Sequence, residues 1–209
     1  DWIASISQAN ANVPAWQDAE STFEEIEVIA VTTNTENLNK QANRIIDLIQ
    51  KYIPYHLLLA VTDGVKTVWN VTYKRINQND NNKRTVDKKF TSEIIDLGGN
   101  NAIHKAFIES LNFSKLASTD LKVLYDSYIQ CFVGLNRAPI IGMFETRPTE
   151  RTKEDVELLE RISQLEKEIT TLSNTAQKET QLNKRIELNT QLQHKRKQIE
   201  QLKNTITNA

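Results

Sequence analysis

The C-terminal part of the chain carries two apolar repeats that are out of phase with each other. In the first, apolar residues recur at alternating steps of four and three, the spacing of a coiled-coil seam: Leu158, Ile162, Leu165, Ile169, Leu172 and Ala176. The second has the same spacing, with one lysine in the seam: Leu188, Leu192, Lys195, Ile199, Leu202 and Ile206. Ala176 and Leu188 are twelve residues apart, whereas an unbroken heptad repeat would separate them by 11 or 14. One continuous helix would need a discontinuity here, and a hairpin would need a turn.

We predict the hairpin, an antiparallel coiled coil over residues 149–209 with its bend between Ser173 and Gln181. The contact between the arms is expected at Leu165, Ile169, Leu172, Leu188 and Leu192, with the first two facing the last two. Three amides near the seam between the arms, Gln181, Asn183 and Asn189, are expected to fix the reversal and the pairing of the arms. One continuous helix in an oligomeric coiled coil is the alternative.

The residues before the hairpin alternate between strand and helix patterns. FEEIEVIAVTT leads into a continuous apolar stretch and predicts a strand, and the spacing after it predicts a helix that ends at Pro54. Asp63-Gly64, between two apolar runs, predicts a tight β-hairpin. We also expect a short helix over residues 1–11, a polar loop over 78–84, a strand over 85–97 and two helices between 101 and 136. The predicted fold class is α+β: a small mixed sheet covered by helices over residues 1–148, followed by the C-terminal helical hairpin.

Charge and cysteine content limit the classes of partner. The chain has 26 Lys and Arg against 27 Asp and Glu, so no global field attracts it to nucleic acid or to a membrane. A single cysteine, Cys131, excludes an internal disulfide and fits a reducing compartment, and we expect it to be buried. Without a long apolar run or a signal peptide, the protein is expected to be cytoplasmic, with no membrane partner. The chain begins with Asp1 rather than Met, which suggests that residues precede it.

The sequence predicts no catalytic residue, no metal site and no cofactor. GGN lacks the spacing and the Lys-Ser/Thr of a phosphate-binding loop. His56, His104 and His194 are scattered rather than paired at helical spacing, and we expect them to be structural or solvated. A metal-dependent nuclease remains as an alternative, because it would need converging carboxylates with a nearby lysine. Its candidates are Asp63, Glu25, Glu27 and Lys74, although Asp63 before a glycine is more typical of a turn.

Two groups of cations suggest a nucleic-acid-binding alternative. Trp69, Val71 and Tyr73 alternate on one strand face and lead into Lys74 and Arg75, a combination that can stack bases and bind phosphates. The competing interpretation is that the aromatic residues pack beneath the helix that ends at Pro54, while the two cations lie in solvent. The second group lies on the hairpin and could neutralise phosphates locally: Lys184, Arg185, Lys195, Arg196 and Lys197.

Several segments together resemble one bacterial family. KETQLNKRIELNTQLQHKRKQIEQL, with IPYHLLLAV ahead of VWNVTYKR and a later LKVLYDSYI, is similar to the family catalogued as domain of unknown function 4391 (DUF4391). The resemblance extends from about Glu24 to about Thr205. Genes of this family tend to lie beside Swi2/Snf2-type helicases and DNA methyltransferases, in loci that look like restriction or anti-phage defence systems.

The resemblance implies a role in an assembly and carries over no catalytic residue. The leading expectation is therefore a non-catalytic accessory subunit of a DNA-processing defence system, which docks onto a helicase or methyltransferase partner. A DNA-binding module that uses the basic arm is the second hypothesis, and the metal-dependent nuclease is the third.

Overall fold

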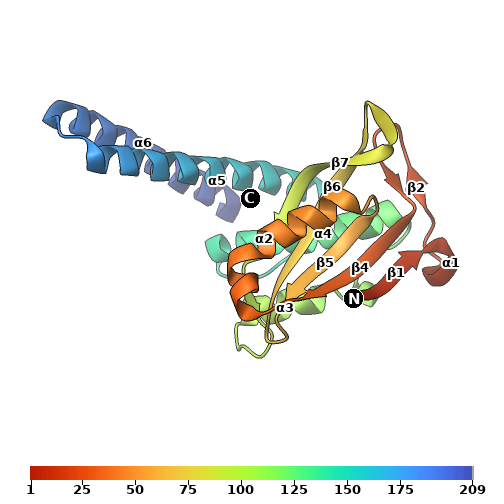
Figure 1. Cartoon of the computed structure of the whole chain (residues 1–209). Helices are drawn as coiled ribbons and strands as arrows, with labels where there is room; N and C mark the ends of the chain where they lie inside the picture. Colours follow the sequence, from red (N-terminus) through yellow and green to blue (C-terminus); the bar gives the residue numbers. More distant parts are fainter. Residues whose placement is uncertain (209) are drawn as a thin grey trace. The chain divides into compact units, whose positions relative to one another are not determined.

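Figure 1 shows the chain as a computed structural model that describes residues 1–208, apart from the side chains of residues 81 and 82. The chain forms two compact units. The first consists of Asp1–Leu135 with Phe144–Thr146, and the second of Asn136–Met143 with the residues from Arg147 onward. The first unit is a helix-covered sheet and the second contains a pair of long helices, so the predicted α+β class and the C-terminal hairpin are confirmed.

The sheet of the first unit is mixed. Its strand order is β1-β4-β5-β6-β7, and β8 pairs with the start of β6. β4 and β5 are parallel, and the other pairs are antiparallel. The strands are β1 (Trp2–Ser7), β4 (Glu25–Thr32), β5 (His56–Thr62), β6 (Lys66–Asn77), β7 (Asp80–Thr91) and β8 (Ile95–Asp96).

The central strand β5 is buried along almost its whole length, as its apolar run predicts. The helix α2 (Thr35–Tyr52) connects β4 to β5 and covers one face of the sheet with its apolar stripe. Asn34 caps its N-terminus by accepting a hydrogen bond from the Asn37 N–H, and Pro54 follows its end. The core between helix and sheet is formed by Leu38, Ala42, Ile46, Leu57, Leu59, Val61 and Val68.

The turn between β5 and β6 is the predicted Asp63-Gly64 hairpin. Gly64 has a φ of +93°, a backbone conformation that is strained for residues with a side chain. The Asp63 carboxylate accepts hydrogen bonds from the N–H groups of Val65 and Lys66, which identifies Asp63 as a turn residue.

The helices α4 (Leu121–Ile141) and α3 (Ala102–Ser110) lie on the opposite face of the sheet (Figure 1). The Tyr125 hydroxyl of α4 accepts a hydrogen bond from Thr72 N–H and lies 3.0 Å from the Leu57 carbonyl oxygen, which ties helix to sheet. Cys131 is buried in α4, as expected. The expected buried stripe of α4 is also confirmed, since Leu121, Leu124, Tyr128 and Phe132 are all buried.

Three sequence-based expectations about local structure are wrong. Residues 1–11 form β1 followed by the four-residue α1 (Gln8–Ala11), because the edge of β4 satisfies backbone groups that a short helix would leave open. The expected polar loop 78–84 is mostly strand, since β7 begins at Asp80 and backbone pairing in a two-stranded ribbon needs no apolar side chains. α4 continues beyond residue 136 to Ile141, through Pro139.

Two short elements complete the first unit. β2 (Trp16–Gln17) and β3 (Thr22–Phe23) form a small antiparallel ribbon, and η1 (Phe113–Lys115) follows α3. The Ile76 N–H of β6 donates to the Glu20 carbonyl oxygen, so the turn of this ribbon is bonded to the far end of β6. None of the helices in residues 1–208 combines the length and apolar character that crossing a membrane requires.

The second unit is dominated by α5 (Thr149–Lys178) and α6 (Leu182–Asn208), which run antiparallel (Figure 1). The chain reverses at residues 179–181, inside the predicted range. The Glu179 carboxylate accepts a hydrogen bond from Gln181 N–H in this turn. The core between the arms is formed by Ile162, Leu165, Ile199 and Ile206, with further apolar residues packed against it.

The register of the hairpin differs from the predicted one. Leu165 packs in a cluster with Ile199 rather than facing Leu188 and Leu192, and Lys195 pairs with Glu168 across the arms at 2.5 Å. The predicted range centres the bend near residue 177, whereas the turn centres on residue 180. When the bend of a helical hairpin moves by one residue along the sequence, each residue in the first arm faces a residue two positions further along in the second arm. A bend displaced by about three residues therefore shifts the pairing of the arms by about one heptad.

A buried ionic cluster that no sequence pattern predicts closes the base of the hairpin. The Asp155 carboxylate lies 3.0 Å from Arg137 Nη1 and 3.3 Å from Arg147 Nη1. Arg147 also donates to the carbonyl oxygen of Ile206, near the end of α6. Arg137 and Asp155 are only 1% and 2% exposed, so these charges are paired within the protein rather than by solvent.

Candidate functional site

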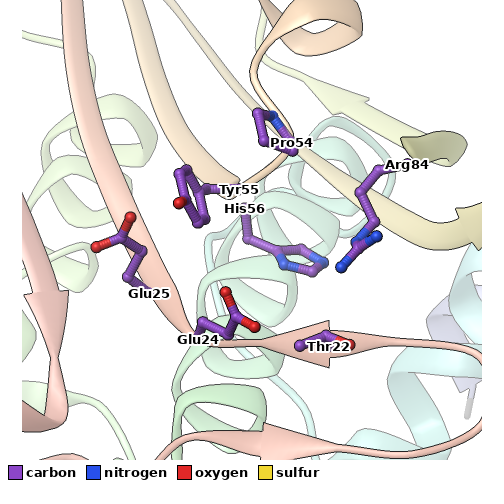
Figure 2. A pocket seen from close by; sticks show the side chains of 7 residues that line it. All are labelled: Thr22, Glu24, Glu25, Pro54, Tyr55, His56 and Arg84. Atoms are coloured by element: carbon purple, nitrogen blue, oxygen red, sulfur yellow. The ribbon is translucent and has the colours of Figure 1, made fainter. Parts of the chain in front are cut away.

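A polar pocket lies where β4 and β5 begin. Its volume is about 200 Å³, and Figure 2 shows the side chains that line it. The ribbon strand β3, the starts of β4 and β5, the α2–β5 loop and β7 all contribute to its wall. The lining residues are Thr22, Glu24, Glu25, Pro54, Tyr55, His56 and Arg84.

His56 is the most deeply buried polar side chain of this pocket. It opens β5 directly after the Pro54 break, and it pairs with Ile26 in the parallel register. Its imidazole stacks on Phe23, with ring centroids 3.9 Å apart, and meets Tyr125 edge-on at 4.7 Å. These two rings fix the imidazole, which points toward the guanidinium of Arg84 in Figure 2.

The environment keeps His56 neutral. Burial, followed by the positive charges of Lys74 and Arg84, lowers the pKa of His56 to about 3. A neutral imidazole has one nitrogen that donates and one that accepts a hydrogen bond. Nε2 of His56 is buried and has no hydrogen-bond partner among the residues that the structure describes. The sequence predicts only a structural or solvated histidine at this position, and no motif indicates the site. The only available signal was a histidine at the start of a fully apolar strand.

Lys74 is not in solvent, contrary to the sequence-based expectation. Its side chain is 1% exposed, and its ammonium donates to the carbonyl oxygens of Ile53 and Tyr55, both at 2.7 Å. Burial lowers the pKa of Lys74 to about 7. Arg75 is exposed but bonded to the Asp87 carboxylate at 2.7 Å. Lys74 therefore holds the loop beside the pocket, and it does not present its charge to a phosphate.

The aromatic residues of β6 pack against α4 rather than beneath α2. Val71 is fully buried, Trp69 and Tyr73 are half-buried, and the Tyr73 hydroxyl bonds to Asp126 of α4. The residues between them point to the other face, where the Gln50 side chain of α2 bonds to Asn70 and Thr72. The strand thus uses this aromatic face for packing.

The residues considered for a nuclease do not converge. Asp63 follows the end of β5, whereas Glu25 lies at the start of β4, and the parallel register places these points at opposite ends of the two strands. Glu27 bonds to the Trp2 indole and Lys74 is buried. Across residues 1–208, no group of three or more His, Cys, Asp or Glu side chains is arranged to hold a metal ion.

The outer face of α6 carries the remaining candidate residues. Lys184, Arg185, Arg196 and Lys197 are exposed, and no ion pair of these four occurs within the described part of the chain. Lys195, by contrast, belongs to the seam through its pair with Glu168. The expected seam residues Leu172 and Leu188 are half-buried and Leu192 is buried. The amides expected to lock the hairpin, Gln181, Asn183 and Asn189, are exposed instead.

Two large apolar side chains near the turn are also exposed. Leu182 and Ile186 are 61% and 55% exposed, and their spacing of four places them on one face of α6. Lys197 is eleven residues, or about three helical turns, beyond Ile186 and so lies on the same side. This face carries two apolar residues at its start and a lysine three turns further along, while the opposite side of α6 packs on α5.

Comparisons with known proteins identify the family and nothing beyond it. No curated protein and no solved structure matches the chain. A family model described as a domain of unknown function, DUF4391, matches residues 1–199. Because this match covers nearly the whole chain, the protein belongs to the DUF4391 family.

Proposed function

We propose that this protein is a non-catalytic accessory subunit of a bacterial, restriction-like anti-phage defence system. In this proposal it acts in the cytoplasm and docks onto a larger DNA-processing partner, a Swi2/Snf2-type helicase or a DNA methyltransferase. The gene neighbourhoods associated with the family support the kind of partner. The helical hairpin supports the way in which the partner is bound.

One observation carries the proposal. Leu182 and Ile186 remain 61% and 55% exposed on a helix that has already buried its seam, so they add nothing to the pairing of the arms. Covering two such side chains with a partner is favourable by about 1.5–3 kcal/mol for each one fully buried. Two exposed apolar residues at i and i+4 match part of the i, i+3, i+4, i+7 pattern by which a helix binds in a groove.

The net positive charge of α6 indicates what kind of partner surface can bind it. Residues 182–208 contain six Lys or Arg and two Glu, although the whole chain is nearly neutral. A complementary partner surface therefore has an apolar groove with acidic side chains at its rim, since unlike charges at a rim speed and orient association.

Co-purification from the native locus tests the proposal. A tagged copy of the chain should recover the helicase or the methyltransferase encoded beside it, and the double variant Leu182→Asp, Ile186→Asp should not. A matched control is Leu48→Asp with Val65→Asp, since these two residues of the first unit are 58% and 62% exposed. Recovery of the wild-type chain alone would contradict the proposal.

DNA binding through α6 is the second candidate, and the exposed cations favour it. Charge reversal at Lys184, Arg185, Lys195, Arg196 and Lys197 should weaken DNA binding and flatten its dependence on salt, because fewer counterions are released. Reversal at Lys195 alone serves as a control, because this lysine is paired with Glu168 and should contribute little. A salt dependence that is unchanged in the fivefold variant would exclude this mode of binding.

A further inference from the structure

We propose that the pocket around His56 binds a small uncharged heterocycle of the nucleobase class, through an edge that presents an N–H donor beside an acceptor atom. This inference rests on the first unit alone and does not depend on docking by the hairpin. It follows from how the pocket is built, from its unpaired nitrogen, from its charges and from its size.

The pocket is a constructed feature of the fold. Stacking on Phe23 and the edge contact with Tyr125 fix the plane of the His56 ring. Lys74 binds the carbonyl oxygens of Ile53 and Tyr55, and it thereby fixes the loop that supplies Pro54 and Tyr55 to the wall. Because the buried Lys74 ammonium bonds to two carbonyl oxygens of this one loop, it holds this part of the pocket wall in a fixed shape.

The unpaired nitrogen of His56 points to a ligand. The side chain is 1% exposed, and Nε2 has no partner among the described residues. A buried polar atom without a hydrogen bond is unfavourable, so a ligand atom that bonds to it gains more than it would at an exposed site. Figure 2 shows the ring pointing toward the guanidinium of Arg84, and a ligand atom that bonds to Nε2 would lie on this side of the pocket.

The lining residues do not favour a simple ion as the ligand. Arg84 supplies N–H donors, whereas Glu24 and Glu25 supply acceptors and two negative charges. A free anion is repelled by the two carboxylates, and within residues 1–208 no group of three or more His, Cys, Asp or Glu side chains is arranged to hold a metal ion. An uncharged ligand with adjacent donor and acceptor atoms can satisfy both sides, with its N–H on Glu24 and its acceptor atom on Arg84.

The size of the pocket agrees with one heterocyclic base. Its volume of about 200 Å³ is below the range of about 300–1,000 Å³ that drug-sized ligands occupy. A single ring system fits, with the sugar of a nucleoside outside. The Tyr55 ring at the rim is 38% exposed and offers a face for stacking.

Each common base offers such an edge. Guanine and uracil carry a ring N–H beside a carbonyl oxygen, and adenine and cytosine carry an amino N–H beside a ring nitrogen that accepts. The pair formed by Glu24 and Arg84 therefore favours a base over a ligand that lacks an adjacent donor and acceptor.

Calorimetric titration of the full chain with nucleosides tests the proposal. At least one of guanosine, uridine, adenosine and cytidine should bind saturably, and inorganic phosphate should not bind at this site. His56→Phe keeps the stacking on Phe23 and removes both ring nitrogens, and it should weaken binding at least tenfold. Glu24→Gln should weaken it similarly, and because Glu24 is exposed this variant should fold normally.

Arg75→Gln is a control outside the pocket. Arg75 does not line the pocket, so this variant should bind nucleosides as tightly as the wild type does. Three results would overturn the proposal: no nucleoside binds, phosphate binds instead, or folded Glu24→Gln and His56→Phe bind as tightly as the wild type.

Discussion

His56 and Lys74 are titratable groups that the fold has placed where charge is unfavourable. Both are about 1% exposed, and burial is the main cause of the lowered pKa of each. Lys74 still finds two carbonyl oxygens, whereas His56 keeps a nitrogen unpaired within the described residues. Because its ammonium is paired with these carbonyl oxygens, Lys74 is a structural residue. His56, which keeps an unpaired nitrogen, is the residue to which a ligand can bond.

Replacing His56 by phenylalanine should make folding less sensitive to acid. The pKa of His56 is about 3 in the folded chain, against an ordinary value of 6.5, so between these values the unfolded chain binds more protons. Stability is therefore lost as the pH falls through this window, at up to about 1.4 kcal/mol per pH unit. Between pH 6 and pH 4, urea unfolding should show the wild type losing about 2 kcal/mol more than His56→Phe. Equal losses in the two proteins would mean that His56 is protonated in the fold.

The hairpin depends on a buried ionic cluster at its base as well as on its seam. Asp155→Asn should destabilise the second unit by about 3–5 kcal/mol, because it leaves buried guanidinium charge beside an uncharged amide. The adjacent Glu154→Gln is the control. Glu154 forms an ion pair with Arg151, and both side chains are largely exposed. Exposed ion pairs of this kind contribute less than about 1 kcal/mol to stability. Chemical denaturation followed by helical circular dichroism measures both, and a similar effect of the two variants would contradict this assignment.

The register of the arms can be checked by crosslinking. In a Cys131→Ser background, Leu165→Cys with Ile199→Cys should form a disulfide within one chain, because these residues share a cluster and a disulfide needs Cα atoms within about 7 Å. Leu165→Cys with Leu188→Cys should not. A crosslink only in the second pair would restore the register first predicted from the sequence, and crosslinks only between chains would indicate an oligomeric coiled coil.

The elements that the sequence predicts well are those specified by local patterns. The apolar run of β5, the stripe of α2 and Asp63-Gly64 each carry their own signal within a few residues. The hairpin register does not, because it depends on where within several polar residues the chain turns. Burial of Lys74 and pairing of Arg137 with Asp155 are set by residues distant in the sequence or hidden in polar segments. The site at His56 was missed for the same reason, since its walls come from separate strands and a loop.

At the scale of the whole molecule, the two units present different chemistry. The first unit contains a small polar pocket beside a neutral buried histidine. The second presents an exposed face of α6 that combines apolar and basic residues. We infer that the hairpin joins the protein to its partner and that the sheet domain holds a small ligand. These roles can be separated by variants in one unit that leave the other intact.

The affinity for the recovered partner tests the central claim, docking through α6, most directly. Purified partner should bind the wild-type chain at least a hundredfold more tightly than the variant Leu182→Asp, Ile186→Asp. That ratio corresponds to about 3 kcal/mol, the loss expected when two apolar contacts are replaced by charge. The variant's helical circular dichroism should remain that of the wild type, because both positions lie outside the seam. Equal affinities of the two folded proteins for the partner would contradict docking through α6.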